Sequence, residues 1–272
     1  MKFFNLLPVL IFSFNFSFSQ NLLDTEHTKK YANYLFNIGD YELASEEFQR
    51  LVFLANSDSA KFFLSICHRK TGKIQKSLGL LGSLLPNVKW KKVVVPEYMK
   101  SLTLSGQHVE AINFGNQNRD DKISYIIAGN MILNNDFKAA KNLIDPKILL
   151  NRASKTEQKL YNLAEKGMNI RYKSPFVASF CSVVIPGLGK AYSKRWQDGL
   201  ISFVLVGTSV WQAYTGFDGK GISSIKGWIF TFFGASFYLS NIYGSFIAAK
   251  HFNKKSKKDI EEETKVVITG SF

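Results

Sequence analysis

The sequence has little of what enzymes and metal proteins need. Its 272 residues include only 2 cysteines and 4 histidines. Cys67 and Cys181 fall in different predicted modules and lack metal-site spacing, so we expect two buried thiols and neither a disulfide nor a metal. The histidines are isolated, and paired acids occur only on expected solvated faces. We therefore predict no active site, no enzyme activity and no cofactor.

Acidic residues are also scarce. The chain carries 35 Lys and Arg against 21 Asp and Glu, a net charge of +14. Such a charge suits nucleic acid or anionic lipid. No recognisable nucleic-acid motif is present, and much of the excess lies beside apolar segments, at 190–195 and 250–258. We therefore expect membrane lipid, and no nucleic acid, as a partner.

Charge is nearly absent from long stretches of the last third. These stretches predict an α-helical membrane module over 174–253, with segments at about 174–189, 197–214 and 228–249. A crossing helix needs about 20 apolar residues. The third segment has them, the second approaches that length, and the first reaches it only across Pro186. The first segment is therefore either a crossing or a re-entrant half-span.

The N-terminus has the form of a secretory signal peptide. Lys2 precedes an apolar run, and Ser17 and Ser19 supply the small residues of a cleavage site before Gln20. We predict a signal peptide over 1–19 and an exported domain after it. An uncleaved signal anchor is the alternative.

A turn followed by a small residue recurs in the next part of the chain. Successive turns are 33, 34 and 29 residues apart, and a small residue follows each turn by five positions. The turn residues are Gly39, Gly72, Gly106 and Asn135, and the small residues are Ala44, Ser77, Ala111 and Ala140. Gly and Asn tolerate the left-handed conformation that ends a helix, and a small residue lets the next helix pack closely.

This period resembles the tetratricopeptide repeat, which is built of helix–turn–helix units. The resemblance covers 20–150 and implies a solenoid whose concave face binds a peptide or protein partner. An irregular helical bundle without a groove is the alternative. The whole chain is thus predicted to be all-α, a tetratricopeptide-like solenoid followed by a small transmembrane module.

Two segments flank the predicted membrane module. A connector over 151–173 opens with the capping box Ser154-Lys155-Thr156-Glu157, which predicts a helix. A charged tail over 254–272 follows the module, and we expect it to be disordered.

The turn between the first two apolar segments has a distinctive pattern of Pro, Gly, basic and aromatic residues. The residues are Pro186, Gly187, Gly189, Lys190, Tyr192, Arg195, Trp196 and Asp198. This pattern, PGxGKxYxxRWxxG, resembles a helical-hairpin module of Bacteroidetes-type envelope proteins of unknown function. The resemblance implies a fold and a membrane location, without an activity. Asp198 is expected to pair with Arg195 or Lys194.

The third apolar segment carries small residues at every fourth position. They are Ser236, Ser240, Gly244 and Ala248. Such a stripe permits close helix approach, so we expect it to pack on the second segment or on a second copy of the chain. Asn241 lies beside the stripe and is expected to face protein, because an amide in lipid needs a partner.

Charge also predicts a topology. Five lysines within 250–258 place the tail in the cytoplasm by the positive-inside rule. An exported repeat domain then requires an odd number of crossings, so we predict three, in a bacterial inner membrane, with the repeats periplasmic.

These features predict a membrane-anchored scaffold of the cell envelope whose repeats bind a protein partner on the exported side. The alternative is an accessory subunit of a transport, secretion or protein-assembly machine, with the membrane module as the working part and contacts to other membrane helices or a second copy. A third hypothesis, an enzyme acting on lipid headgroups through Arg195 and Asp198, has no further motif to support it.

Overall fold

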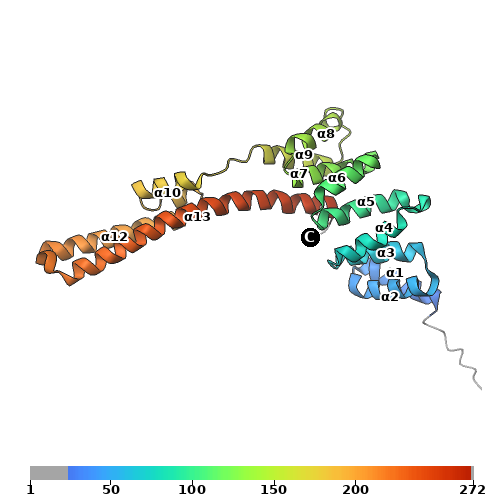
Figure 1. The fold of residues 1–272 in the computed structure, drawn as a ribbon, viewed down its shortest axis with the longest axis horizontal. Coiled ribbons are helices and arrows are strands. Elements are labelled where there is room, and N and C mark those ends of the chain that lie inside the picture. The colour runs from blue at the N-terminus through green and yellow to red at the C-terminus, as the bar shows by residue number, and fades with distance from the viewer. Residues whose placement is uncertain (1–23, 271–272) are drawn as a thin grey trace, which may run out of the picture. The chain divides into compact units, whose positions relative to one another are not determined.

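The structure is a computed structural model that describes residues 24–270 (Figure 1). Over this range all regular elements are helices, so the all-α prediction is confirmed. The predicted signal peptide, 1–19, lies outside the described residues. The described residues divide into two compact units, with the boundary between Val94 and Val95.

The first unit contains two antiparallel helix pairs. Its helices are α1 (Thr25–Ile38), α2 (Tyr41–Ala55), α3 (Asp58–Lys70), α4 (Ile74–Leu84) and the start of α5 (Val88–Leu104). The side chains of Asp24, Asp40 and Ser57 cap α1, α2 and α3 by accepting a backbone N–H in the first turn. Each cap satisfies a donor that the helix leaves unpaired, which fixes where the helix begins.

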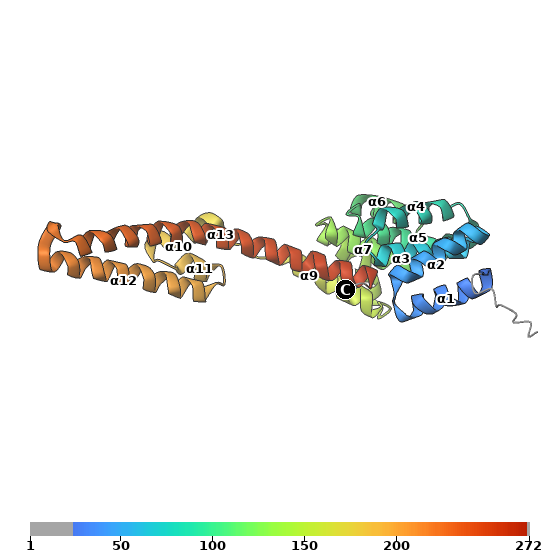
Figure 2. The ribbon, with the colours of Figure 1, turned by 90° about the horizontal axis from the view of Figure 1, so that it is seen from below.

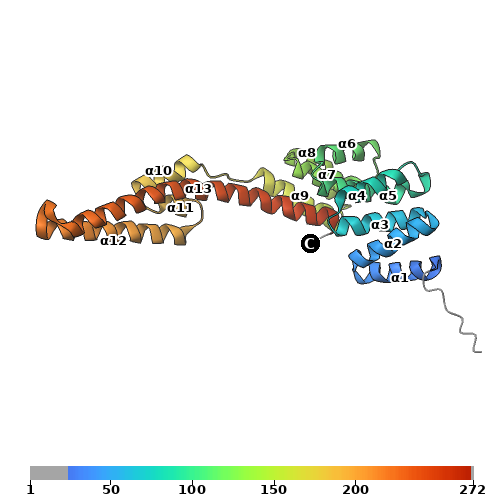
Figure 3. The ribbon, with the colours of Figure 1, turned by 60° about the horizontal axis from the view of Figure 1, so that its bottom comes forward.

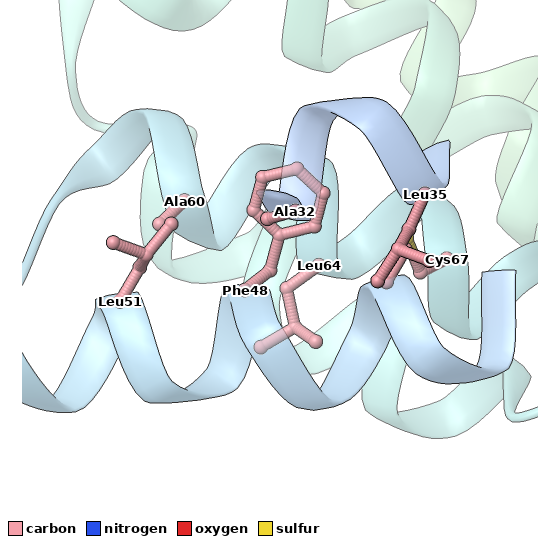
Figure 4. Close-up of a cluster of buried hydrophobic side chains, with 8 residues drawn as sticks. Ala32, Leu35, Phe48, Leu51, Ala60, Leu64 and Cys67 are labelled. Atoms are coloured by element: carbon pink, nitrogen blue, oxygen red, sulfur yellow. The ribbon is translucent and has the colours of Figure 1, made fainter. Parts of the chain in front are cut away.

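One apolar cluster joins α1, α2 and α3 (Figure 4). Phe48 of α2 lies among Ala32 of α1 and Leu64 of α3, and it stacks on the ring of Phe63 at 5.4 Å. Cys67 belongs to this cluster, and burial raises the pKa of its thiol to about 12. The side chain therefore acts as a small apolar residue.

The turns expected from the sequence adopt the left-handed conformation. The backbone φ angles are +86° at Gly39, +77° at Gly72, +82° at Gly106 and +64° at Asn135. The small residues after these turns, Ala44, Ser77, Ala111 and Ala140, are all 0% exposed. Helix pairs therefore approach closely at these positions in both units.

The second unit begins with the remaining helix pairs. They are α6 (His108–Gln117), the 3-10 helix η1 (Asp121–Ile123), α7 (Ser124–Leu133), α8 (Phe137–Leu149) and α9 (Lys155–Met168). The predicted capping box forms at the start of α9, with Ser154 and Glu157 bonding to each other's backbone N–H.

Glu157 connects three helices of this unit. Its carboxylate accepts hydrogen bonds from Lys147 Nζ at 2.6 Å and from Ser124 Oγ at 2.9 Å, in addition to those from Ser154. Burial by itself would raise the pKa of Glu157, but the bonds from Lys147, Ser154 and Ser124 outweigh it and lower the pKa to about 2. The carboxylate thus ties the start of α7 and the body of α8 to the start of α9.

The rest of the second unit contains two short and two long helices (Figures 1 and 2). They are α10 (Pro175–Val184), α11 (Leu188–Tyr192), α12 (Trp196–Lys220), the 3-10 helix η2 (Gly221–Ser223) and α13 (Ile225–Thr269). Among the described residues, one helical span, Trp196–Ser223, is long and apolar enough to cross a membrane. The third apolar segment, expected to qualify alone, falls short because its serines, glycines and Asn241 lower its mean hydropathy.

The prediction of a disordered tail over 254–272 is wrong for the described part, because α13 continues to Thr269 without interruption. Lysines and glutamates favour a helix, and the pairs Lys257–Glu261 and Lys258–Glu262 support it at i,i+4 spacing.

The end of α13 packs against α7 and α9 of the same unit. Ile260 shares an apolar cluster with Ala128 of α7 and Leu160 of α9, and Ile268 lies against Gly129. The last turns of α13 therefore belong to the same compact unit as α7 and α9.

Candidate functional site in the helical hairpin

The first apolar segment turns back on itself. Ser174 caps α10, and Pro175 occupies its first turn. The helix has 10 residues, a length of about 15 Å, which is half of the roughly 30 Å of a bilayer core. The chain then reverses, and α11 returns so that Tyr192 Oη accepts a hydrogen bond from the Ser174 N–H at 3.4 Å. The chain therefore reverses within 174–192, and Tyr192 lies beside the start of α10.

Glycines make the reversal possible. A Cβ on Gly187 would lie 1.9 Å from the Gly199 carbonyl oxygen, and one on Gly189 would lie 1.8 Å from that of Ala178. Gly187 also has a φ of +90°, which L side chains rarely adopt. The predicted turn residues Gly187 and Gly189 thus let α10, α11 and α12 approach to backbone contact.

The helices α12 and α13 form an antiparallel pair (Figures 2 and 3), termed the hairpin over 196–253. The buried positions of α12 are Gly199, Ser202, Val206, Ser209, Ala213 and Gly216. Those of the facing part of α13 are Gly227, Gly234, Asn241, Ser245, Ala248 and Ala249. Most of these residues are small, and many recur after seven positions, which is the spacing that keeps one face of each helix on its neighbour.

The predicted stripe on α13 is therefore only partly correct. Ala248 is buried and Gly244 is half-buried, but Ser236 and Ser240 are exposed. A strict four-residue repeat drifts around a helix of 3.6 residues per turn, whereas a seven-residue repeat stays on one face. Asn241 does face protein, as expected.

Large apolar side chains cover the outside of α10, α12 and α13. Phe176 is 78% exposed, Trp211 is 67%, Phe232 is 71% and Leu239 is 66%. The interior is small and polar while the exterior is large and apolar, which is the reverse of a water-soluble bundle. In the apolar helical span Trp196–Ser223, only 22% of the most apolar stretch is buried.

Several polar side chains meet inside the hairpin. Lys190 of α11 donates to Ser202 Oγ of α12 at 2.7 Å, and Ser182 of α10 bonds to Ser245 of α13 at 2.7 Å. A pocket of ≈ 500 Å³ lies beside Lys190 between α12 and α13. Its lining includes Asn241 and the ion-paired Arg195 and Asp198.

Lys173, at the start of the module, is joined to α13 and α11 by amide hydrogen bonds and a cation–π contact. Asn253 of α13 accepts from the Lys173 N–H at 2.8 Å and donates to the Lys173 carbonyl at 2.9 Å. The ammonium of Lys173 also lies 4.5 Å from the centre of the Tyr192 ring. These bonds place the start of α10 and the middle of α13 at one level.

The structure brings three of the predicted turn residues, Lys190, Arg195 and Asp198, to one pocket, and it forms the expected Arg195–Asp198 ion pair. Tyr192 instead contacts Ser174 at the start of α10, and Trp196 is exposed. The role of Ser202 was missed by sequence reasoning. The seven-residue recurrence of small and polar residues along α12 is the pattern that would have found it.

Comparison with protein-family models and with curated protein sequences finds no match for this chain. Both sequence resemblances therefore stay predictions, and what the chain does has to be inferred from its own residues.

Proposed function

We propose that this protein is a membrane-anchored scaffold: the module over 174–253 sits in a bilayer, and the helix pairs present a surface to a protein partner. The observation that carries the proposal is the reversed polarity of the hairpin. Rings such as Phe176, Trp211 and Phe232 are exposed around a small, polar interior. Exposing so many large apolar groups to water is costly, whereas lipid accommodates them.

The helix pairs are proposed to form a tetratricopeptide-like solenoid. The recurring turns with positive φ and the fully buried small residues support this assignment. The signal-like N-terminus favours the exported side of a bacterial inner membrane for these helices. Because the end of α13 packs on α7 and α9, the tail is proposed to lie on that side with them, against the cytoplasmic expectation from the lysines of 250–258.

This topology has two crossings, formed by α12 and the apolar part of α13, with α10 and α11 as a re-entrant pair. It is tested by labelling single cysteines from outside intact cells, in a chain with Cys67 and Cys181 replaced by alanine. The reporters are Lys89→Cys, Lys255→Cys and Ile222→Cys, all at exposed positions.

We expect Lys89→Cys and Lys255→Cys to be labelled and Ile222→Cys, in the loop of the hairpin, to be protected. Labelling of Ile222→Cys alone would place the helix pairs in the cytoplasm and end the exported-side proposal. Labelling of Lys89→Cys without Lys255→Cys would restore three crossings. A chain that sodium carbonate washes from membranes would end the anchoring proposal.

A partner surface is suggested by aromatic residues of the first unit. Tyr31 and Tyr34 stack at 6.5 Å and are 50% and 58% exposed, and Phe53 is 88% exposed. Aromatic side chains are enriched where proteins bind one another. A photo-crosslinking residue at Phe53 should give one discrete adduct in cells, and the same residue at the exposed control position Lys29 should not. Equal results at both positions would contradict a specific partner surface.

A second candidate, an accessory subunit of a membrane machine, is favoured by an apolar groove of ≈ 600 Å³ between α12 and α13. Its lining includes the small residues Ala213, Gly234 and Ala235, which admit a close helix. If Ala235→Leu abolishes function in cells while Phe53→Ala does not, this candidate replaces the scaffold.

A further inference from the structure

The pocket beside Lys190 has an unusual lining for a hairpin with so apolar an exterior. It combines a lysine, an arginine and an aspartate with Ser202 and Asn241. Arg195 and Asp198 form an ion pair, so their charges offset each other. Lys190 then leaves the pocket with one net positive charge, which favours an anion.

Asn241 is the second observation. It is 3% exposed, and neither polar atom of its side chain has a hydrogen-bond partner among residues 24–270. A buried amide without a partner destabilises the folded protein. Asn241 is among the residues that line this pocket, so its amide N–H groups are candidate donors to a ligand there.

The two groups lie at one level of the hairpin. Gly216 approaches Gly227 and Ser209 approaches Gly234, and this antiparallel register sets Ser202 opposite Asn241. Lys190 Nζ bonds to Ser202, and an ammonium has three donors, so two remain for a ligand. A Cβ on Gly244 would lie only 3.2 Å from Lys190 Cε, so this glycine leaves the space that the lysine uses.

The remaining lining indicates what the anion is attached to. Ile201, Leu205 and Phe237 continue the pocket onto the apolar exterior. Ser202 lies six residues into α12, or about 9 Å from its start, where Trp196 is exposed in the manner of an interfacial anchor. A lipid whose charged headgroup lies near Ser202 and whose acyl chain lies along the exterior matches both the polar and the apolar residues of the lining.

We propose that this pocket binds the phosphate of an anionic phospholipid, with Lys190 and Asn241 as its donors. The proposal rests on the membrane embedding proposed above. Inorganic phosphate supplies the same anion without the acyl chains, and it is the alternative source that the test has to distinguish. In a bilayer, polar residues at such depth commonly mark a binding site.

The test measures the thermal unfolding midpoint of the full chain in neutral detergent. Three additions are compared: phosphatidylglycerol, diacylglycerol, which has the acyl chains without the phosphate, and inorganic phosphate. We expect phosphatidylglycerol alone to raise the midpoint by several degrees. A ligand that binds only the folded protein stabilises it in this way.

Two variants and a matched control locate the effect. Lys190→Met and Asn241→Leu should each raise the phosphatidylglycerol concentration needed for a half-maximal shift at least tenfold. Lys194→Met, at a neighbouring lysine outside the lining, should leave that concentration unchanged. Asn241→Leu removes an amide without a partner, so it should fold and unfold at a higher temperature without lipid. This variant keeps the test decisive if Lys190→Met does not fold.

Each other outcome overturns the proposal. An equal shift with diacylglycerol means that the pocket ignores the anion, and a shift retained in Asn241→Leu means that this amide binds no ligand. A pocket-dependent shift with inorganic phosphate, equal to that with phosphatidylglycerol, assigns the site to soluble phosphate. A chain that stays in carbonate-washed membranes yet ignores phosphatidylglycerol refutes this inference alone, whereas a chain washed from membranes refutes the embedding first.

Discussion

The contact between Ile268 and Gly129 decides whether the end of α13 belongs to the helix pairs. Ile268 is 2% exposed, and its Cδ1 lies 2.3 Å from where a Cβ on Gly129 would be. Replacing a buried isoleucine with alanine costs roughly 2–5 kcal/mol. Because only a few side chains hold this segment, we expect Ile268→Ala to weaken its docking by about 3 kcal/mol, which raises the open fraction about 100-fold.

Hydrogen exchange of the amides over 260–269, measured on the full chain in detergent, checks this prediction. Ile268→Ala should speed their exchange about 100-fold, and the control Glu262→Ala, which removes only an exposed i,i+4 pair, should change it by less than about threefold. Equal exchange in both variants would show that the tail is not docked.

A double-mutant cycle gives a second check on the same contact. Gly129→Ala forces its new methyl against Ile268, and overpacking of this kind costs roughly 1–3 kcal/mol. In a chain that already carries Ile268→Ala the methyl has space, so the second substitution should cost almost nothing. Additive effects would mean that the two residues do not touch.

Three further results are expected. The low pKa of Glu157 contributes roughly 3 kcal/mol to the free energy of unfolding. This contribution is fully present above pH 4.5, the usual pKa, and is lost as the pH falls towards 2. In urea unfolding, Glu157→Gln should lower stability at pH 7 and reduce the loss of stability between pH 4.5 and pH 2. Gly189→Ala should prevent the hairpin from folding, because its methyl meets backbone, whereas Gly207→Ala, with open space around it, should be neutral or slightly stabilising in thermal unfolding. Cys67, buried and with a pKa of about 12, should react with thiol reagents at pH 8 only after denaturation; rapid reaction of the native protein would contradict its burial.

The helix-pair turns could be predicted because their physics is local. Gly39 and Asn135 end helices by adopting positive φ, and the capping box at Ser154 depends only on residues within one turn. Ala44 and Ala140 were recognisable as packing positions from their distance to these turns. Such features need no knowledge of the tertiary fold.

The docked tail and the pocket could not be predicted so directly, because both depend on residues far apart in sequence. Charge over 254–265 suggested disorder, although Ile260, Thr264 and Ile268 form a buried face at helical spacing. The pocket joins Lys190 to Asn241 across 51 positions, and only the antiparallel register of α12 and α13 places them together. The reversal of the chain after α10 depends on the backbone approach of Gly187 to Gly199, two residues on different helices.

The unbroken length of α13 has a mechanical consequence. Two connections join the hairpin to α7–α9: the segment 169–174 and the last third of α13. The side chain of Asn253 links them through its two hydrogen bonds to Lys173. A domain held by a single flexible linker rotates freely, whereas a domain held by two connections that are bonded to each other resists rotation. A rotation of α7 and α9 is therefore transmitted to the hairpin through the continuous helix α13, while the irregular segment 169–174 follows it through the bond to Asn253.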